Sequence, residues 1–107
     1  WFRKGPDGKF LWPGFGENSR VLEWVFNRVN GKGGANKTAI GYVPSADDLD
    51  LDGLGLSAEA VAELRKVDPD EWRAEVPSIE EHFAFLGDHL PHELRDQLAA
   101  LEKRLSD

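Results

Sequence analysis

Two apolar stripes at helical spacing occupy the C-terminal part of the sequence, and they constrain the fold more than any other feature. In the second stripe, leucine recurs every three or four residues from Leu94 to Leu105. The first stripe has the same spacing and comprises Trp72, Val76, Ile79, Phe83 and Leu86. Each stripe covers one face of a helix, and the short interval between them favours antiparallel packing. The sequence therefore predicts a helical hairpin at the C-terminal end, with a structural role.

Residues that start or interrupt helices place the boundaries of these segments. Asp68 followed by Pro69 provides a capping side chain and a proline at the first helical position. Ser57 caps a shorter helix before it, and Leu90-Pro91 opens the last one. Pro77 falls inside the first stripe, and we expect it to kink or restart that helix.

Short extended segments are expected in the N-terminal part. Residues 3–9 contain Pro-Asp-Gly, which is typical of a tight turn, so a short hairpin should form there. Residues 38–43 before Pro44 have the composition of a short strand or an extended packing segment. The predicted fold class is α+β and predominantly α, with a short N-terminal hairpin and extended segments followed by helices that end in an antiparallel helical hairpin.

A further helix is expected between the two extended segments. It should begin near Asn18 or Ser19, since either side chain can cap free N–H groups, and continue to Val29 before Gly31 ends it. Its apolar stripe comprises Val21, Leu22, Val25, Phe26 and Val29.

Charge divides the chain of 107 residues into two parts. Residues 1–44 contain seven basic and three acidic residues, whereas residues 45–107 contain six basic and seventeen acidic residues. The chain thus comprises an aromatic and basic segment at 1–44 and an acidic helical tail at 45–107. Such an asymmetry suggests that the two parts meet different partners, the first of them an anion.

Composition excludes several classes of protein. The chain has neither cysteine nor methionine, which excludes a disulfide scaffold and a thiolate metal site. No apolar run approaches the roughly 20 residues that a membrane span needs, and no export signal is present, so we predict a cytoplasmic protein without a membrane partner. The start at Trp1, in the middle of an aromatic and basic stretch, favours a domain of a longer protein.

Two groups of potential metal ligands lack a recognised spacing. The aspartates of residues 47–52 alternate with leucines, but the glycine and the final glutamate of an EF-hand loop are not in place. We expect a solvated loop that its leucines hold down. His82, His89 and His92 have no carboxylates at ligand spacing, so they are expected on the surface. No metal site is predicted in this chain.

Aromatic residues gather at the N-terminal end, where seven of the eleven lie within the first 26 residues. Large side chains in a short irregular segment either build its core or form a binding surface. Phe2, Phe10 and Phe15 lie on a hairpin and a glycine-rich loop, where their rings can sandwich a planar heterocycle.

Hydrogen-bonding groups for such a heterocycle are expected where the loop enters the helix. Backbone N–H groups around Gly16, Glu17 and Asn18 should be free to donate to a ring carbonyl, while nearby carbonyls accept from a ring amine. Guanine suits this arrangement better than adenine. A Gly-x-Gly sequence before a helix is also typical of an anion site, and no Walker-type Gly-Lys-Ser/Thr ending is present.

The segments Trp1–Lys4 and Gly8–Trp24 resemble the guanine-binding segment of the GTP-dependent phosphoenolpyruvate carboxykinases. Residues 38–44 and 49–54 are similar to that family too, and the helical tail fits its C-terminal end. The resemblance implies an enzyme, a decarboxylating lyase of gluconeogenesis, that converts oxaloacetate and GTP into phosphoenolpyruvate, GDP and CO2. It also implies that Phe2, Phe10 and Phe15 stack around guanine, and that residues 15–18 hydrogen-bond to its edge.

The resemblance implies that residues 1–107 form a single C-terminal nucleotide-base-binding subdomain of a larger enzyme, in which 1–44 is the guanine-binding segment. It also implies that the catalytic machinery lies outside this chain. The family's phosphate-binding loop, catalytic lysine, ligands for a divalent metal (Mn²⁺ or Mg²⁺), oxaloacetate-binding arginines and mobile lid are implied to precede Trp1. The implied partners are a guanine nucleotide, GTP or GDP, and the remainder of the enzyme chain. Because phosphoryl transfer needs metal ions and cationic groups at the phosphates, the chain alone is expected to be inactive. No catalytic residue is predicted within it.

Two alternative functions stay open at this point. An autonomous helical protein-interaction module would use the aromatic residues as its core, with Phe2 and Phe15 buried, and would dock its acidic half onto a basic partner. Nucleic-acid binding through the basic, aromatic part conflicts with a net charge of −7, so no nucleic-acid partner is predicted. Exposure of the phenylalanine rings distinguishes a base clamp from a core.

Overall fold

The structure is a computed structural model that describes residues 1–107. Four α-helices, two short 3-10 helices and one two-stranded sheet confirm the predicted class, α+β and predominantly α. The chain divides into two compact units: unit 1 comprises residues 1–37 and 42–66, and unit 2 comprises residues 38–41 and 67–107. None of the helices has both the length and the apolar character required to traverse a bilayer.

Unit 1 begins with the predicted hairpin. Lys4 and Phe10 form an antiparallel bridge, and the Leu11 N–H donates to the Arg3 carbonyl at 2.9 Å. The Asp7 carboxylate accepts from the Lys9 N–H at 3.0 Å and holds the turn. Backbone hydrogen bonds therefore join the segment before the Pro-Asp-Gly turn to the segment after it.

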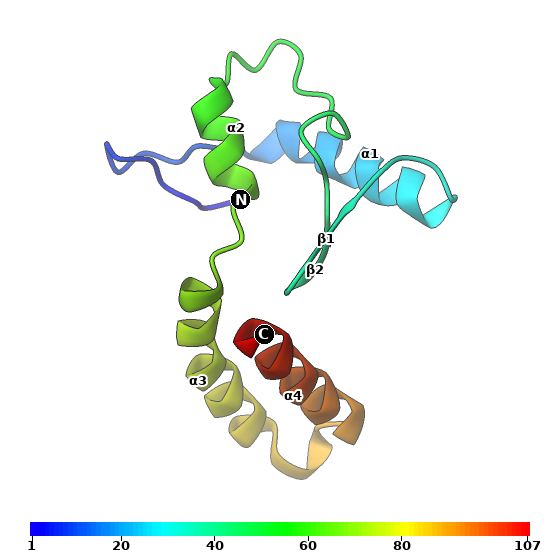
Figure 1. Ribbon diagram of the computed structural model, residues 1–107, viewed down its shortest axis with the longest axis vertical. Helices are drawn as coiled ribbons and strands as arrows, with labels where there is room; N and C mark the ends of the chain where they lie inside the picture. Colours follow the sequence, from blue (N-terminus) through cyan, green and yellow to red (C-terminus); the bar gives the residue numbers. More distant parts are fainter. The chain divides into compact units, whose positions relative to one another are not determined.

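The helix α1 (Asn18–Val29) follows the 3-10 helix η1 (Phe15–Glu17) without an interval (Figure 1). The predicted start and end of α1 are confirmed, but neither predicted cap is formed, because Glu17 is the capping residue and it makes no side-chain cap. The chain leaves α1 through Gly31, whose φ of 71° lies in the left-handed region.

The apolar stripe of α1 is largely uncovered. Its exposed members are Leu22, Val25, Phe26 and Val29, which recur at the spacing of one helix face. Contiguous exposed apolar surfaces are typical of sites that contact other protein, membrane or ligand.

Residues 36–43 form a β-hairpin of β1 (Asn36–Thr38) and β2 (Gly41–Val43). Residues 38–43, predicted as a short strand or an extended packing segment, are therefore interrupted by a turn between the two strands. Gly41 adopts a φ of 123°, which permits the chain to reverse, and the Thr38 hydroxyl donates to the Gly41 carbonyl at 2.7 Å across the turn.

The helix α2 (Ala58–Arg65) completes unit 1. Ser57 Oγ accepts from the Ala60 N–H at 3.1 Å, so the predicted cap is confirmed. At the other end of α2, Arg3 Nη1 donates to the Glu63 carbonyl at 3.0 Å and to its carboxylate at 3.2 Å. These bonds join the N-terminal hairpin to α2.

Unit 2 contains the predicted helical hairpin. The helices α3 (Pro69–Leu86) and α4 (His92–Ser106) pack side by side and are joined through the 3-10 helix η2 (Gly87–His89) (Figure 1). The predicted start of α3 is confirmed, because Asp68 Oδ1 accepts a hydrogen bond from the Asp70 N–H at 2.9 Å. The three histidines are exposed, as predicted.

The helix α3 runs through Pro77 without restarting. Proline removes one backbone hydrogen bond, but Val76 beside it is buried, and packing against α4 supports the turns on both sides. The buried side chains of unit 2 are Val76, Leu90 and Leu105, and Leu105 is only 2% exposed.

Candidate functional site

Phe2 and Phe10 form an aromatic pair on the N-terminal hairpin. Their ring centroids are 5.8 Å apart and the planes are inclined by 63°, an edge-to-face contact. The Lys4 ammonium lies 5.5 Å from the centroid of the Phe10 ring. Phe2 is 77% exposed and Phe10 57%, so the pair presents ring surface to solvent instead of building a core.

Phe15 is the most exposed aromatic residue of the chain, at 99%. It is also the one non-glycine residue with a positive φ, 45°. A bulky side chain in the left-handed region is held there by its surroundings at a cost in free energy, and such strain gathers at ligand sites. The structure makes no ring contact between Phe15 and the Phe2–Phe10 pair.

Gly14 supplies the backbone geometry that presents Phe15. Its φ of 77° and ψ of −172° lie in a region that is open essentially to glycine alone.

We expect Gly14→Ala to destabilise the loop by about 1–3 kcal/mol, the strain of one alanine forced into a backbone region that is open essentially to glycine alone. A Cβ at Gly14 would meet no atom within 4 Å, so the cost is conformational and not a clash. Gly16→Ala is the matched control, because a Cβ there also meets open space and its φ is not positive. Hydrogen exchange of the loop amides in the full-length protein measures how much each variant destabilises the loop. Equal destabilisation by the two variants would contradict the claim that the backbone conformation at Gly14 requires glycine.

The backbone N–H groups of the loop are only partly free. The Glu17 N–H donates to the Gly14 carbonyl at 3.1 Å, and the Asn18 N–H donates to the carbonyls of Phe15 and Gly16. The expectation of free N–H groups at Glu17 and Asn18 was therefore wrong, because the 3-10 turn uses them internally. The Gly16 N–H has no partner within the chain and remains available to a ligand.

The side chains of Asn18 and Glu17 are each hydrogen-bonded by a residue outside the predicted site. Trp12 Nε1 donates to Asn18 Oδ1 at 2.8 Å, and Trp12 is only 6% exposed. Arg20 Nε donates to Glu17 Oε2 at 2.6 Å. A buried indole usually finds an acceptor for its N–H, so Asn18, six residues further along, was a candidate acceptor that the sequence already contained.

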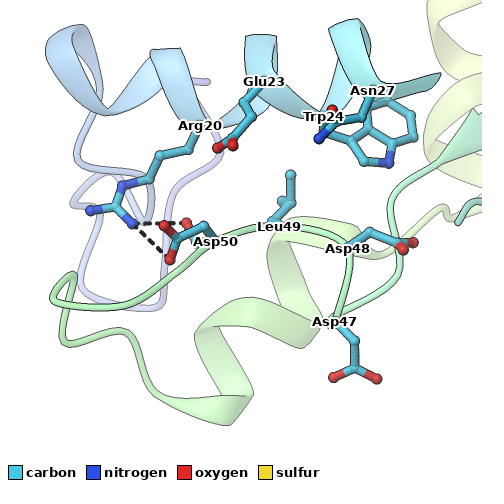
Figure 2. A pocket seen from close by; sticks show the side chains of 8 residues that line it. All are labelled: Arg20, Glu23, Trp24, Asn27, Asp47, Asp48, Leu49 and Asp50. Atoms are coloured by element: carbon cyan, nitrogen blue, oxygen red, sulfur yellow. Dashed lines mark hydrogen bonds and ion pairs between the residues drawn. The ribbon is translucent and has the colours of Figure 1, made fainter. Parts of the chain in front are cut away.

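Arg20 links the 3-10 helix η1 to the loop that contains Asp50. Besides Glu17, Arg20 contacts the Asp50 carbonyl at 2.9 Å and the Asp50 carboxylate at 3.3 Å through Nη1 (Figure 2). The hydrogen bond to Glu17 is the largest of the effects that raise the pKa of Arg20. The charged Arg20 side chain thus joins Glu17, two residues after Phe15, to Asp50.

A polar hollow of about 270 Å³ lies between α1 and the loop of residues 47–50 (Figure 2). Asp48 holds this loop, because its carboxylate accepts from the Ser45 N–H at 2.7 Å and from the Gly34 N–H at 3.0 Å. Hydrogen bonds from the Ser45 side chain and then from backbone N–H groups lower the pKa of Asp48. Nowhere in the structure do three or more histidine or acidic side chains gather as they would around a metal ion.

The comparison with protein families assigns the chain to a class. Residues 1–104 match the family described as the phosphoenolpyruvate carboxykinase C-terminal P-loop domain, and the chain belongs to this family.

Three curated relatives carry the name phosphoenolpyruvate carboxykinase [GTP]. The protein of Corynebacterium efficiens is 48% identical over 105 residues, which cover 98% of this chain and 17% of the relative. The protein of Arthrobacter sp. strain FB24 is 50% identical over 107 residues, which cover 100% of this chain and 18% of the relative. The protein of Renibacterium salmoninarum is 49% identical over 105 residues, which cover 98% of this chain and 17% of the relative. The chain thus spans less than a fifth of the length of these relatives.

The P-loop in the family's description does not correspond to a segment of this chain. Gly31–Thr38 comes nearest to the Gly-x-x-x-x-Gly-Lys-Ser/Thr motif, with Asn36 where the motif has its second glycine. This segment leaves α1 and enters β1, whereas a P-loop leads from a strand into the N-terminus of a helix. The candidate contact with a nucleotide is therefore the loop of residues 13–16, which carries Phe15 and is called the phenylalanine loop, and not a phosphate-binding loop.

Proposed function

We propose that this chain forms the guanine-recognition segment of a GTP-dependent phosphoenolpyruvate carboxykinase. The full-length enzyme would convert oxaloacetate and GTP into phosphoenolpyruvate, GDP and CO2, the reaction that the resemblance implies, and its relatives carry the name phosphoenolpyruvate carboxykinase [GTP]. One observation carries the proposal: Phe2, Phe10 and Phe15, to which the resemblance assigns stacking on guanine, are all exposed.

The aromatic residues would supply the affinity for the base. The ring of Phe15 is open to solvent on both faces, and the Phe2–Phe10 pair offers a second aromatic surface on the hairpin. Stacking on a ring tolerates any base, so it does not select guanine by itself.

Selection of guanine would come from the loop that follows Phe15. The Gly16 N–H is an unused donor, and so is the amide nitrogen of Asn18. Donors of this kind pair with the 6-oxo group of guanine and oppose the 6-amino group of adenine. Glu17 would contribute through its backbone carbonyl, because its N–H donates to the Gly14 carbonyl and Arg20 occupies its carboxylate.

The phosphoryl-transfer chemistry would be performed by the rest of the enzyme. The transfer needs cationic groups and a divalent metal, Mn²⁺ or Mg²⁺, at the phosphates, and the residues that hold them would lie outside this chain. This chain would hold the base, and by itself it would be catalytically inactive. The exposed apolar face of α1 supports a second role as a contact with the remainder of the enzyme chain.

The alternative of an autonomous interaction module is not supported. It required Phe2 and Phe15 to be buried in an aromatic core, but both rings are exposed and the buried aromatic residue of unit 1 is Trp12.

The proposal predicts a preference of the full-length protein for guanine over adenine nucleotides. We expect ADP to bind at least about fivefold more weakly than GDP, because a hydrogen-bond donor left facing another donor costs about 1–3 kcal/mol. Isothermal titration calorimetry with the two diphosphates measures this ratio. Equal affinities would contradict the proposal.

A further inference from the structure

The hydrogen bond between Trp12 and Asn18 connects the buried part of unit 1 to the candidate base site. Trp12 is the buried hydrophobic side chain of unit 1, and its Nε1 lies 2.8 Å from Asn18 Oδ1. Asn18 is the first residue of α1 and directly follows the turn that carries Phe15. The buried Trp12 side chain therefore holds Asn18, three residues after the exposed Phe15, through this hydrogen bond.

The chemistry of the indole determines which end of the Asn18 amide faces Trp12. An indole N–H donates and never accepts, so it pairs with the amide oxygen and opposes the amide nitrogen. Asn18 Nδ2 makes no hydrogen bond within the chain, and no buried polar side-chain atom lacks a partner, so Nδ2 is open to solvent. Trp12 therefore leaves a pure donor exposed beside Phe15.

We propose that Trp12 is a positioning residue that fixes the Asn18 amide with Nδ2 outward, and that this orientation selects purines with a 6-oxo group. The inference rests on the proposed function, since it assumes that the base lies at Phe15. An unrestrained asparagine can rotate its amide and present either a donor or an acceptor, and would then accept a 6-amino purine as well. Trp12 removes that second orientation, because rotation would set two donors against each other.

The test uses Trp12→Phe in the full-length protein, with calorimetric titration of GDP, IDP and ADP. Phenylalanine keeps most of the buried apolar surface and removes the N–H. GDP and IDP share the 6-oxo group and differ at position 2, so we expect the GDP to ADP and IDP to ADP affinity ratios to fall by the same factor, on the order of tenfold. Most of this fall should come from stronger binding of ADP, because the freed amide can turn its oxygen toward the 6-amino group. The outcome that overturns the inference is an unchanged ratio of GDP to ADP affinity.

A matched control separates positioning from general stability. Trp24 Nε1 also donates one hydrogen bond, to the Gly34 carbonyl at 3.0 Å, away from the phenylalanine loop. Trp24→Phe should leave the GDP to ADP ratio unchanged. The double variant Trp12→Phe/Asn18→Ala should show no further loss of the ratio beyond Asn18→Ala, because Trp12 acts through Asn18. Additive losses would show an independent effect of Trp12 and would overturn the inference.

A measurement on the unmodified protein covers the case in which Trp12→Phe does not fold. With ¹⁵N-labelled asparagine side chains, the Asn18 Nδ2 protons should shift on addition of GDP or IDP and not of ADP; no shift with GDP would overturn the inference. The two hypotheses fail differently. Equal binding of GDP and ADP by the unmodified protein refutes the proposed function, whereas a preference for GDP that survives Trp12→Phe refutes only the role of Trp12.

Discussion

Replacing Phe15 by alanine is expected to weaken the binding of guanine nucleotides to the full-length protein by about 1–3 kcal/mol, the range for one lost stacking surface. The ring is 99% exposed in the structure, so its removal deprives the core of no contact. The substitution also replaces a bulky side chain at a φ of 45°, and it does not add strain there. The loss should therefore fall on the nucleotide and not on the fold.

The measurement for Phe15→Ala is calorimetric titration with GDP, together with thermal unfolding to verify the fold. Phe85→Ala is the matched control, because Phe85 is another largely exposed phenylalanine that lies in unit 2. We expect Phe85→Ala to leave the affinity for GDP unchanged. If Phe15→Ala did the same, the assignment of this ring to the base would be wrong.

The parts of the fold that the sequence predicts well depend on repeated or local signals. The helical hairpin follows from two stripes whose many apolar positions agree with one another. The caps at Ser57 and Asp68 follow from side chains that bond to an N–H only two or three residues away. Neither inference needs to know which distant segments meet.

Other features depend on choices that the sequence leaves open. Gly41 can end a strand or reverse the chain, and the structure shows the reversal. Asn18 can cap the helix with its side chain or bond elsewhere, and Trp12 takes its oxygen. The N–H groups before α1 can be free or can close a 3-10 turn, and the turn uses two of them. The exposed phenylalanines were predictable as a group. Asn18 could be recognised only as one possible acceptor for Trp12, and the contact of Arg20 with Asp50 gave no local signal.

The largest effect on stability is expected from Leu105→Ala. Leu105 lies in the last turn of α4 and is 2% exposed, the least of the buried residues in unit 2. Truncation of a buried leucine removes its transfer free energy and leaves a cavity, which together cost about 2–5 kcal/mol. The Leu105 carbonyl accepts a hydrogen bond from Arg73 Nη1, and alanine keeps that carbonyl, so the loss isolates side-chain packing.

Leu94→Ala provides the control, because Leu94 lies on the same helix and carries the same side chain but is 44% exposed. We expect Leu94→Ala to cost less than half as much as Leu105→Ala, since part of its surface is already in water. Hydrogen exchange of the α3 and α4 amides in the full-length protein gives the free energy of opening for both variants. Similar costs for the two leucines would show that Leu105 is not the centre of the contact between α3 and α4. A large loss confined to Leu105→Ala would show that this contact depends on the last turn of α4.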